Sequence, residues 1–251
     1  MPKTAGFLIS DVLAKGWEDF KKHAGFLVCT YVIVTFLFLA LLAPFIILEL
    51  KALSERAEER YLTTLLVRIL FEGIVGTWFA LGIITVNLKI IRGETPSFLD
   101  LYTSARKLFT AYLAWLFLIL AFILGFLMLI IPAYFIMLIV IFYMWFIVDR
   151  NMGAMDSIWA SIEATRGSRW KLLLLLMLFW ILSILAIIPC GLGIFIVWPW
   201  SILSLTHVYE TLANKADASE ELISRAAQDH PALENGEEDE GPAAPADGAM
   251  A

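Results

Sequence analysis

The sequence predicts an all-α integral membrane protein in which six transmembrane helices form three repeats of an amphipathic interfacial helix plus a helical hairpin. Three observations lead to this prediction. Of the 251 residues, 61% are hydrophobic and only 17% are charged, whereas soluble domains carry about 25% charged residues. Long stretches contain no charge at all, and Asp and Pro recur at a nearly constant spacing. The composition argues against an ordinary soluble enzyme.

The transmembrane helices are predicted from stretches without Asp, Glu, Lys or Arg. These stretches cover residues 24–48, 73–88, 108–148 and 172–209. One crossing needs about 20 residues, so each of the two longest stretches must fold back once. Pro132 and Pro189 stand at suitable reversal points, because proline removes a helix hydrogen-bond donor. The predicted helices are therefore 25–48, 66–91, 109–131, 133–149, 171–189 and 194–212.

The distribution of Lys and Arg predicts the orientation. The N-terminal arm, the loop between the second and third helices and the loop between the fourth and fifth together hold twelve of these residues, and the opposite side holds three. Cytoplasmic loops of membrane proteins carry the excess of Lys and Arg. We therefore expect both termini in the cytoplasm and the lipid bilayer as the first partner of the chain.

A threefold repeat is marked by an Asp followed by a Pro 32 or 33 positions later. The three pairs are Asp11 with Pro44, Asp100 with Pro132, and Asp156 with Pro189. Each unit is expected to contain a cytoplasmic amphipathic helix, a span, a proline break and a returning span. The predicted domains are a membrane domain over residues 1–213, with repeats at about 5–92, 94–150 and 152–213, and a tail over 214–251.

The helix that precedes the first span of each unit has an apolar face. Its members are Phe7, Val12, Leu13, Trp17 and Phe20 in the first unit, and Met155, Ile158, Trp159 and Ile162 in the third. In the second unit, Ser97 and Asp100 have the spacing of a capping box. Two arrangements remain open. The helices either lie partly in the membrane interface or pack only against the cytoplasmic ends of the spans.

Two charged segments depart from the repeat. Residues 49–61 interrupt the first unit, and their Glu and Arg residues at helical spacing predict an external helical extension of the first two spans, with a solvated face or a partner site. Residues 214–251 hold ten acids and two bases. We expect a short helix over 215–227 and disorder beyond His230. The tail then serves for solvation or for docking of a basic partner.

Short motifs give the chain a resemblance to a known family. They are Gly-Trp-Glu-Asp-Phe at 16–20, Ile-Arg-Gly-Glu-Thr-Pro-Ser-Phe-Leu-Asp-Leu at 91–101, Leu-Ile-Ile-Pro at 129–132 and Val-Asp-Arg-Asn-Met-Gly-Ala-Met-Asp-Ser at 148–157. With these motifs, residues 5–213 resemble a group of six-span bacterial and archaeal proteins related to the membrane domain of some glycerophosphoryl diester phosphodiesterases. The resemblance implies the six-span fold and a prokaryotic cytoplasmic (inner) membrane. In the phosphodiesterases a separate soluble domain carries the chemistry, so we expect no such activity here.

Residue types that carry catalysis are scarce. The chain holds three His and two Cys, without a His-Glu-x-x-His or Cys-x-x-Cys metal motif or a Gly-x-Ser-x-Gly nucleophile motif. We therefore predict no catalytic, cofactor-binding or metal-binding residue, no cofactor and no enzymatic activity. We also expect no nucleic-acid partner.

Arg68 and Glu72 are the most informative polar residues. Their i, i+4 spacing places both on one face of the second span. The uncharged stretch that follows Glu72 has 16 residues, and at about 1.5 Å per residue it is shorter than the bilayer core. Ionisable residues inside a span are costly and are functional candidates. The two residues are therefore either a functional intramembrane pair or an interfacial pair that ends the span.

The sequence is compatible with two functions. The repeat and the lack of catalytic groups favour a non-enzymatic scaffold or envelope-homeostasis factor, which would bind a membrane-protein partner or form a homo-oligomer. The alternative is a transporter or lipid-translocating protein, since repeats and broken helices also occur in transporters. A dry bundle centre would count against transport, and an open cavity reaching Arg68 or Glu72 would count against a pure scaffold.

Overall fold

The computed structural model contains helices and no strand in the residues that it describes, which are 7–128, 136–188 and 191–229. This confirms the all-α prediction for those residues. Among the described residues, four helices have the length and mean hydropathy of membrane spans: Ile9–Ser54, Glu58–Ile91, Leu108–Phe126 and Arg169–Ile187. Each corresponds to one of the six predicted spans. Pro132 and Pro189 lie outside the described residues, as does the reversal expected around Pro132.

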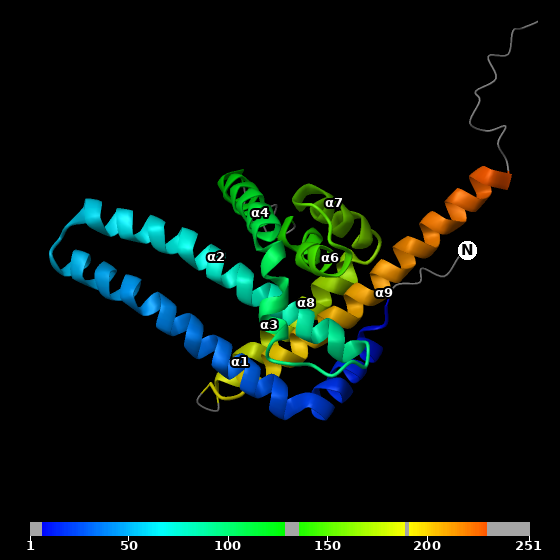
Figure 1. The fold of residues 1–251 in the computed structure, drawn as a ribbon, viewed down its shortest axis with the longest axis horizontal. Helices are drawn as coiled ribbons and strands as arrows, with labels where there is room; N and C mark the ends of the chain where they lie inside the picture. The colour runs from blue at the N-terminus through cyan, green and yellow to red at the C-terminus, as the bar shows by residue number, and fades with distance from the viewer. Residues whose placement is uncertain (1–6, 129–135, 189–190, 230–251) are drawn as a thin grey trace, which may run out of the picture. The chain divides into compact units, whose positions relative to one another are not determined.

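α1 (Ile9–Ser54) and α2 (Glu58–Ile91) form a long hairpin, drawn in blue and cyan in Figure 1. The helical extension expected over residues 49–61 is confirmed, because α1 continues to Ser54 and α2 begins at Glu58. The short turn between the helices places Arg56 in the left-handed region, with a φ of 54°. Both helices are therefore longer than a single membrane crossing requires.

α1 joins two segments that the sequence presents as separate elements. The backbone leaves helical geometry at His23, with φ −118° and ψ 16°, and this kink separates the amphipathic segment from the span. α1 runs through Pro44 to Ser54, in agreement with the predicted helix over residues 25–48, so the proline break expected from the repeat is wrong in the first unit. Proline is tolerated inside membrane helices, and good helix formers such as Leu, Lys and Ala follow it here.

A capping arrangement leads from α2 to the next long helix. The backbone N–H of Ser97 donates to Asp100 Oδ2 at 2.8 Å, as the capping-box prediction requires. Asp100 begins α3 (Asp100–Thr103), which is followed by the 3-10 turn η1 (Ser104–Lys107) and by α4 (Leu108–Met128). The amphipathic helix expected before this span is therefore reduced to two short turns.

The span predicted over residues 133–149 is not one continuous helix in its described part. Residues 136–139 are helical, residues 140–142 form a turn, and α6 (Tyr143–Arg150) follows. The turn consists of Val, Ile and Phe, so the sequence has no Pro or Gly that would predict it. The prediction of a single helix here is therefore wrong.

The next helix, α7 (Ala154–Ala164), supplies hydrogen-bond partners for this break. Ser161 Oγ accepts a bond from the Phe142 backbone N–H at 3.1 Å and donates one to Ile139 O at 3.0 Å. Thr165 Oγ1 also lies 3.3 Å from Ile139 O, although its shortest contact, at 2.9 Å, is with Ser161 O. Because a buried backbone group without a hydrogen-bond partner is costly, these side chains stabilise the interrupted helix.

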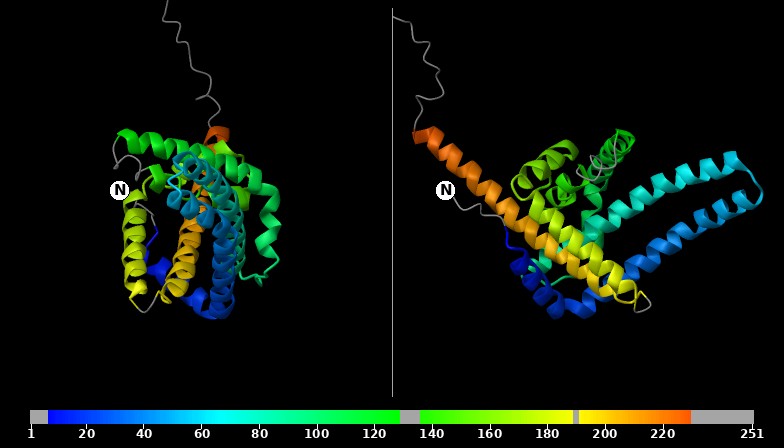
Figure 2. Two further views of the ribbon diagram at one scale, coloured as in Figure 1. Left: turned by 90° about the vertical axis from the view of Figure 1, so that its left-hand side faces the viewer. Right: turned by 180° about the vertical axis from the view of Figure 1, so that it is seen from behind.

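α8 (Arg169–Ile187) and α9 (Ile194–Asp229) form a second hairpin, coloured yellow to orange in Figure 2. Gly191, with a φ of 77°, lies in the connection and permits the reversal. The rings of Phe179 and Trp200 meet edge to face across the hairpin, with centroids 5.7 Å apart. Apolar contacts of this kind hold the two helices together.

The amphipathic segment of α1 packs mainly against protein. Phe7 and Val12 are buried, and Trp200 Nε1 of α9 donates to Leu13 O at 3.3 Å. Trp17 lies 5.3 Å from the Trp200 ring but keeps 39% of its surface exposed. The apolar face of this segment is thus covered by the bundle, with Trp17 at its uncovered edge.

The chain divides into two compact units, residues 1–213 and 214–251. α9 crosses the boundary between them. The short helix expected over residues 215–227 is the C-terminal part of α9, which continues to Asp229. The disorder expected beyond His230 lies outside the described residues.

Candidate functional site

Arg68 on α2 holds two carboxylates. Its Nη1 donates to Glu72 Oε2 at 2.8 Å, and its Nε donates to Glu49 Oε1 on α1, also at 2.8 Å. The sequence spacing predicts the contact with Glu72, but it gives no sign of Glu49, which lies 19 positions from Arg68. The only available signal is that Glu49 ends an uncharged stretch of the first span.

Glu72 lines a cavity of about 360 Å³ between α1, α2, α4 and α6. The other lining residues are Phe38, Ile69, Gly73, Gly76, Thr77, Trp115 and Met144. Thr77 is 2% exposed, and its hydroxyl has no hydrogen-bond partner among the described residues. Gly73 makes room for the indole, since a Cβ at Gly73 would lie 2.5 Å from Trp115 Cη2. The cavity therefore combines largely apolar walls with one carboxylate, and the Thr77 hydroxyl is itself buried.

A second cavity, of about 410 Å³, adjoins the first. The two share Phe38, Gly76 and Met144 as lining residues. Its remaining walls are largely apolar and come from α1, α2, α6 and α9: Tyr31, Val34, Thr35, Leu39, Phe79, Ala80, Ile83, Ile84, Trp145, Trp198 and Ile202. We call the two cavities together the crevice. Their sizes lie within the range of about 300 to 1,000 Å³ that is typical of ligand pockets.

The interrupted helix forms one wall of the crevice. Met144 and Trp145 lie directly after the turn at residues 140–142 and line it. Trp145 is fixed in place, because its Nε1 donates to Thr206 Oγ1 at 3.1 Å. The hydrogen bonds from Ser161 to the turn therefore also position residues of the crevice.

Comparison with known proteins assigns the chain to a family. Residues 23–228 match the family model described as Domain of unknown function (DUF7847). The chain belongs to the DUF7847 family. No curated protein and no solved structure matches it. The region that matches the DUF7847 model begins at the His23 kink of α1 and contains every residue that lines the crevice.

A second group of ionisable residues lies within the DUF7847 region, where α2, α6 and α9 meet. Arg92 Nη2 lies 2.7 Å from Asp149 Oδ1, and Arg92 Nε lies 3.6 Å from Glu210 Oε1. Tyr209 donates its hydroxyl to Asp149 Oδ2 at 2.9 Å. Burial disfavours the charged guanidinium, but Asp149 and Glu210 together outweigh this effect and raise the pKa of Arg92 above its ordinary value. This group ties three helices together.

Lys107 adds a contact beside this group. Its Nζ donates to the backbone oxygen of Val148, at the end of α6. Burial lowers the pKa of Lys107 below the ordinary lysine value, and the nearby Asp149 carboxylate only partly offsets the shift. Lys107 thus connects the start of α4 to the end of α6.

A third polar contact joins the amphipathic segment of α1 to α9. His207 Nε2 and Asp19 Oδ2 lie 2.8 Å apart, and Lys22 Nζ approaches Asp19 Oδ1 at 3.7 Å. Groups of three or more His, Cys, Asp or Glu side chains able to hold a metal are absent from the described residues. These contacts therefore position helices and give no geometry of a metal centre.

The residues that mark the repeat occupy different surroundings. Asp11 is exposed on α1, and Asp156 is exposed in the first turn of α7. Asp100 is 4% exposed and accepts a hydrogen bond from Lys89 Nζ at 2.7 Å. Pro44 lies inside a helix rather than at a break. The marker residues are thus not brought together at one site.

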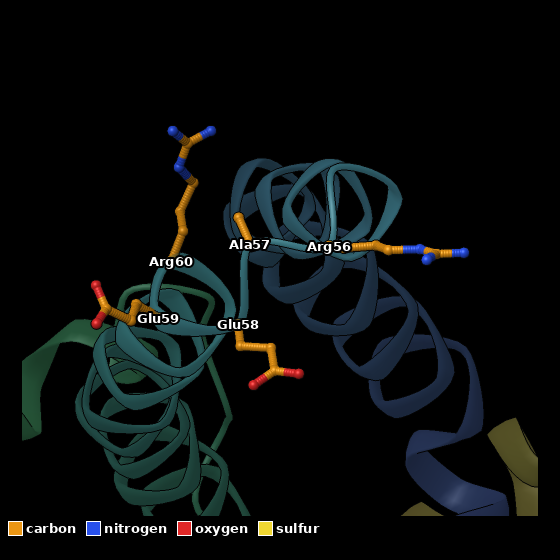
Figure 3. Close-up of a pocket in the computed structure, with 5 residues that line it drawn as sticks. All are labelled: Arg56, Ala57, Glu58, Glu59 and Arg60. Atoms are coloured by element: carbon orange, nitrogen blue, oxygen red, sulfur yellow. The ribbon is translucent and has the colours of Figure 1, made fainter.

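A hollow at the tip of the α1–α2 hairpin contrasts with the crevice. It is lined by Arg56, Ala57, Glu58, Glu59 and Arg60. In Figure 3 the side chains of Arg56 and Arg60 point away from each other, and Glu58 and Glu59 also diverge. Since these charged groups do not converge on a common point, the hollow does not form a binding site.

Proposed function

We propose that this protein binds a lipid-like amphiphile within the bilayer, in the crevice, and moves it as a transporter or lipid-translocating protein. The observation that carries the proposal is the crevice itself, which reaches Glu72 and is otherwise walled by apolar and aromatic side chains. Such a cavity fits a molecule with a polar head and an apolar chain. It is not required by a scaffold that acts only through its outer surface.

The interrupted helix supports the same function. Transporters of several folds build their substrate sites from discontinuous membrane helices. Here the turn at residues 140–142 precedes two crevice residues, Met144 and Trp145. A turn of this kind offers a place at which α6 can move relative to the α1–α2 hairpin without breaking its own helical hydrogen bonds.

The cellular setting belongs to the proposal as well. We place the protein in a prokaryotic cytoplasmic membrane with six spans, cytoplasmic termini and the hairpin tip outside. The excess of Lys and Arg on the side of the termini supports this orientation. The relationship to the membrane domain of glycerophosphoryl diester phosphodiesterases stays a prediction.

The test is to fill the crevice. Gly76 lines both cavities, and a Cβ placed there would find only Phe38 Cε2, at 3.9 Å. Gly76→Leu therefore projects a side chain into open space. Gly25→Leu is the matched control, because Gly25 is exposed on α1 and a Cβ added there would meet no neighbour within 4 Å.

Two readouts compare these variants in reconstituted vesicles. A hexadecanol that carries a photoactivatable diazirine should label crevice residues in the wild type and in Gly25→Leu, and much less in Gly76→Leu. A fluorescent-lipid translocation assay should follow the same order. Equal labelling and equal flux in all three proteins would refute the proposed function.

A scaffold is the second candidate, and one observation favours it. Leu53, Leu62 and Leu66, near the tip of the α1–α2 hairpin, are 64%, 56% and 63% exposed. If they contact a second copy, Leu62→Cys should form cross-links between copies in native membranes, whereas a Cys in place of the exposed Lys15 should not.

A further inference from the structure

We infer that the amphiphile taken up by the crevice has a cationic, ammonium-type headgroup that lies beside Glu72. This inference rests on the amphiphile-binding function proposed above and names the class of ligand for the same site. It follows from the charge of the residues around Arg68, from the aromatic side chains of the cavity that Glu72 lines, and from the three lining residues that the two cavities share.

The charges around Arg68 do not balance. Glu49 and Glu72 contribute two carboxylates against one guanidinium, which leaves a formal charge of −1. Glu49 is 15% exposed and is held by Arg68, but the Glu72 side chain keeps 41% of its surface uncovered by protein. Its Oε2 accepts the bond from Arg68, and its Oε1 has no hydrogen-bond partner among the described residues.

This excess of negative charge favours a ligand with a positively charged headgroup. The uncovered carboxylate is the only charged group that lines the crevice in the described part of the chain. A cationic headgroup would neutralise it, whereas a phosphate or carboxylate would meet a like charge. Because the surroundings are apolar, the preference is stronger than it would be in water.

Aromatic rings supply a second, independent attraction for a cation. Trp115 and Phe38 line the same cavity as Glu72. The Trp115 ring stacks on that of Tyr112, with centroids 5.6 Å apart and planes at 14°, and it lies against Gly73. A fixed indole near a carboxylate is a favourable environment for an ammonium group, since cations are attracted to the faces of aromatic rings.

A primary ammonium group carries N–H donors, and Glu72 Oε1 offers it an acceptor without another partner among the described residues. The alkyl chain of the ligand then extends past Phe38 and Met144 into the apolar second cavity.

A pair of probes with the same chain tests this inference. They are hexadecylammonium and hexadecanol, each with a diazirine at the same carbon, added to the full-length protein in nanodiscs of uncharged digalactosyl diacylglycerol. In the wild type the ammonium probe should label crevice residues about fivefold more than the alcohol, because a desolvated cation gains both the ring and the carboxylate. Glu72→Gln should reduce this preference and leave only the part that the Trp115 ring supplies.

Glu59→Gln is the matched control, because Glu59 is an exposed carboxylate on the same helix that does not line the crevice. It should keep the wild-type preference. Trp115→Leu keeps the charge and removes the indole, so it should weaken the preference without abolishing labelling by the alcohol. It also serves as the test if Glu72→Gln does not purify as a single species.

The outcomes separate this inference from the proposed function. Equal labelling by the two probes in the wild type, with both blocked by Gly76→Leu, would overturn the cationic headgroup and leave amphiphile binding in place. A preference that neither Glu72→Gln nor Trp115→Leu reduces would also overturn the inference. No labelling of the crevice by either probe would remove the proposed function itself.

Discussion

Arg68 and Glu49 lie on different helices, and the 2.8 Å hydrogen bond from Arg68 Nε to Glu49 Oε1 ties α1 to α2 below the tip of their hairpin. Both side chains are largely covered, at 23% and 15% exposure. A charge-assisted bond in such surroundings is stronger than one in water. This contact therefore fixes the position of Arg68, and through Arg68 that of Glu72 at the crevice.

A double-mutant cycle between Glu49→Gln and Arg68→Gln should measure this coupling. We expect a coupling energy of about 1.5 kcal/mol, in the range of hydrogen bonds to charged groups. Reversible unfolding in mixed detergent micelles gives the free energies. The matched control is the Arg60–Glu55 pair in the same hairpin, with side chains 61% and 41% exposed, for which about 0.3 kcal/mol is expected. Equal coupling in both pairs would contradict the structural role of Glu49.

Two glycines of α2 should respond oppositely to the same substitution. A Cβ at Gly82 would lie 2.7 Å from Leu101 O and 2.8 Å from Leu101 Cα, and the backbone there cannot yield easily. Gly82→Ala should therefore lower the free energy of unfolding by about 1 to 3 kcal/mol. Gly76→Ala meets no close neighbour and should raise it by about 0.5 to 1 kcal/mol through helix propensity. Thermal unfolding in detergent compares them, and a Gly82→Ala protein as stable as wild type would refute this packing.

Ser161→Ala should destabilise the interrupted helix. The change removes the partner of the Phe142 N–H and one partner of Ile139 O, and an orphaned buried group costs about 1 to 3 kcal/mol. Ser157→Ala is the control, since Ser157 is equally buried but its hydroxyl bonds only to Ala154 O within α7. The unfolding free energies of the two variants give the comparison. A larger loss for Ser157→Ala would contradict the role assigned to Ser161.

The sequence predicts helices well where charge boundaries define them. The absence of charge predicts 109–131 and 171–189, and the structure has Leu108–Met128 and Arg169–Ile187. It fails at residues 140–142, because the partner that stabilises that turn is Ser161, about 20 positions later. Such a break depends on tertiary hydrogen bonds rather than on local propensity.

At the candidate site, too, the sequence predicts contacts within one helix but not contacts between helices. The i, i+4 spacing indicates the contact between Arg68 and Glu72, because both lie on one helix. Glu49 and the shared walls of the two cavities depend on how α1, α2 and α6 pack, which no local pattern records. Pro44 shows the converse error, since a local helix breaker is overridden by its surroundings.

Lys107 should make stability depend on pH in the alkaline range. Its pKa in the folded state is lowered by burial, while the unfolded chain keeps the ordinary value of about 10.4. Between these two values the unfolded state binds more protons, so the free energy of unfolding rises as the pH rises through that window. Below the folded-state pKa, the cost of burying the charged amine is fully present.

The measurement is the melting temperature between pH 8 and 10.5, taken as the difference between wild type and Lys107→Met. This difference should move in favour of the wild type as the pH rises. Lys15→Met, which changes an exposed lysine of α1, controls for general effects of charge. A difference that stays flat, or that falls with pH, would contradict the burial of the Lys107 amine.

The proposed orientation predicts opposite accessibility for two exposed arginines. Arg60 lies near the hairpin tip and Arg166 in the connection between α7 and α8, with side chains 61% and 69% exposed. In a background with Cys29 and Cys190 replaced, a membrane-impermeant maleimide should label Arg60→Cys in intact cells. Arg166→Cys should react only after lysis, because the excess of Lys and Arg places its side in the cytoplasm. Labelling of Arg166→Cys but not of Arg60→Cys in intact cells would invert the topology and would place Glu72 nearer the cytoplasmic surface. Labelling of both sites in intact cells would show that the tip of the α1–α2 hairpin and the α7–α8 connection lie on the same side of the membrane.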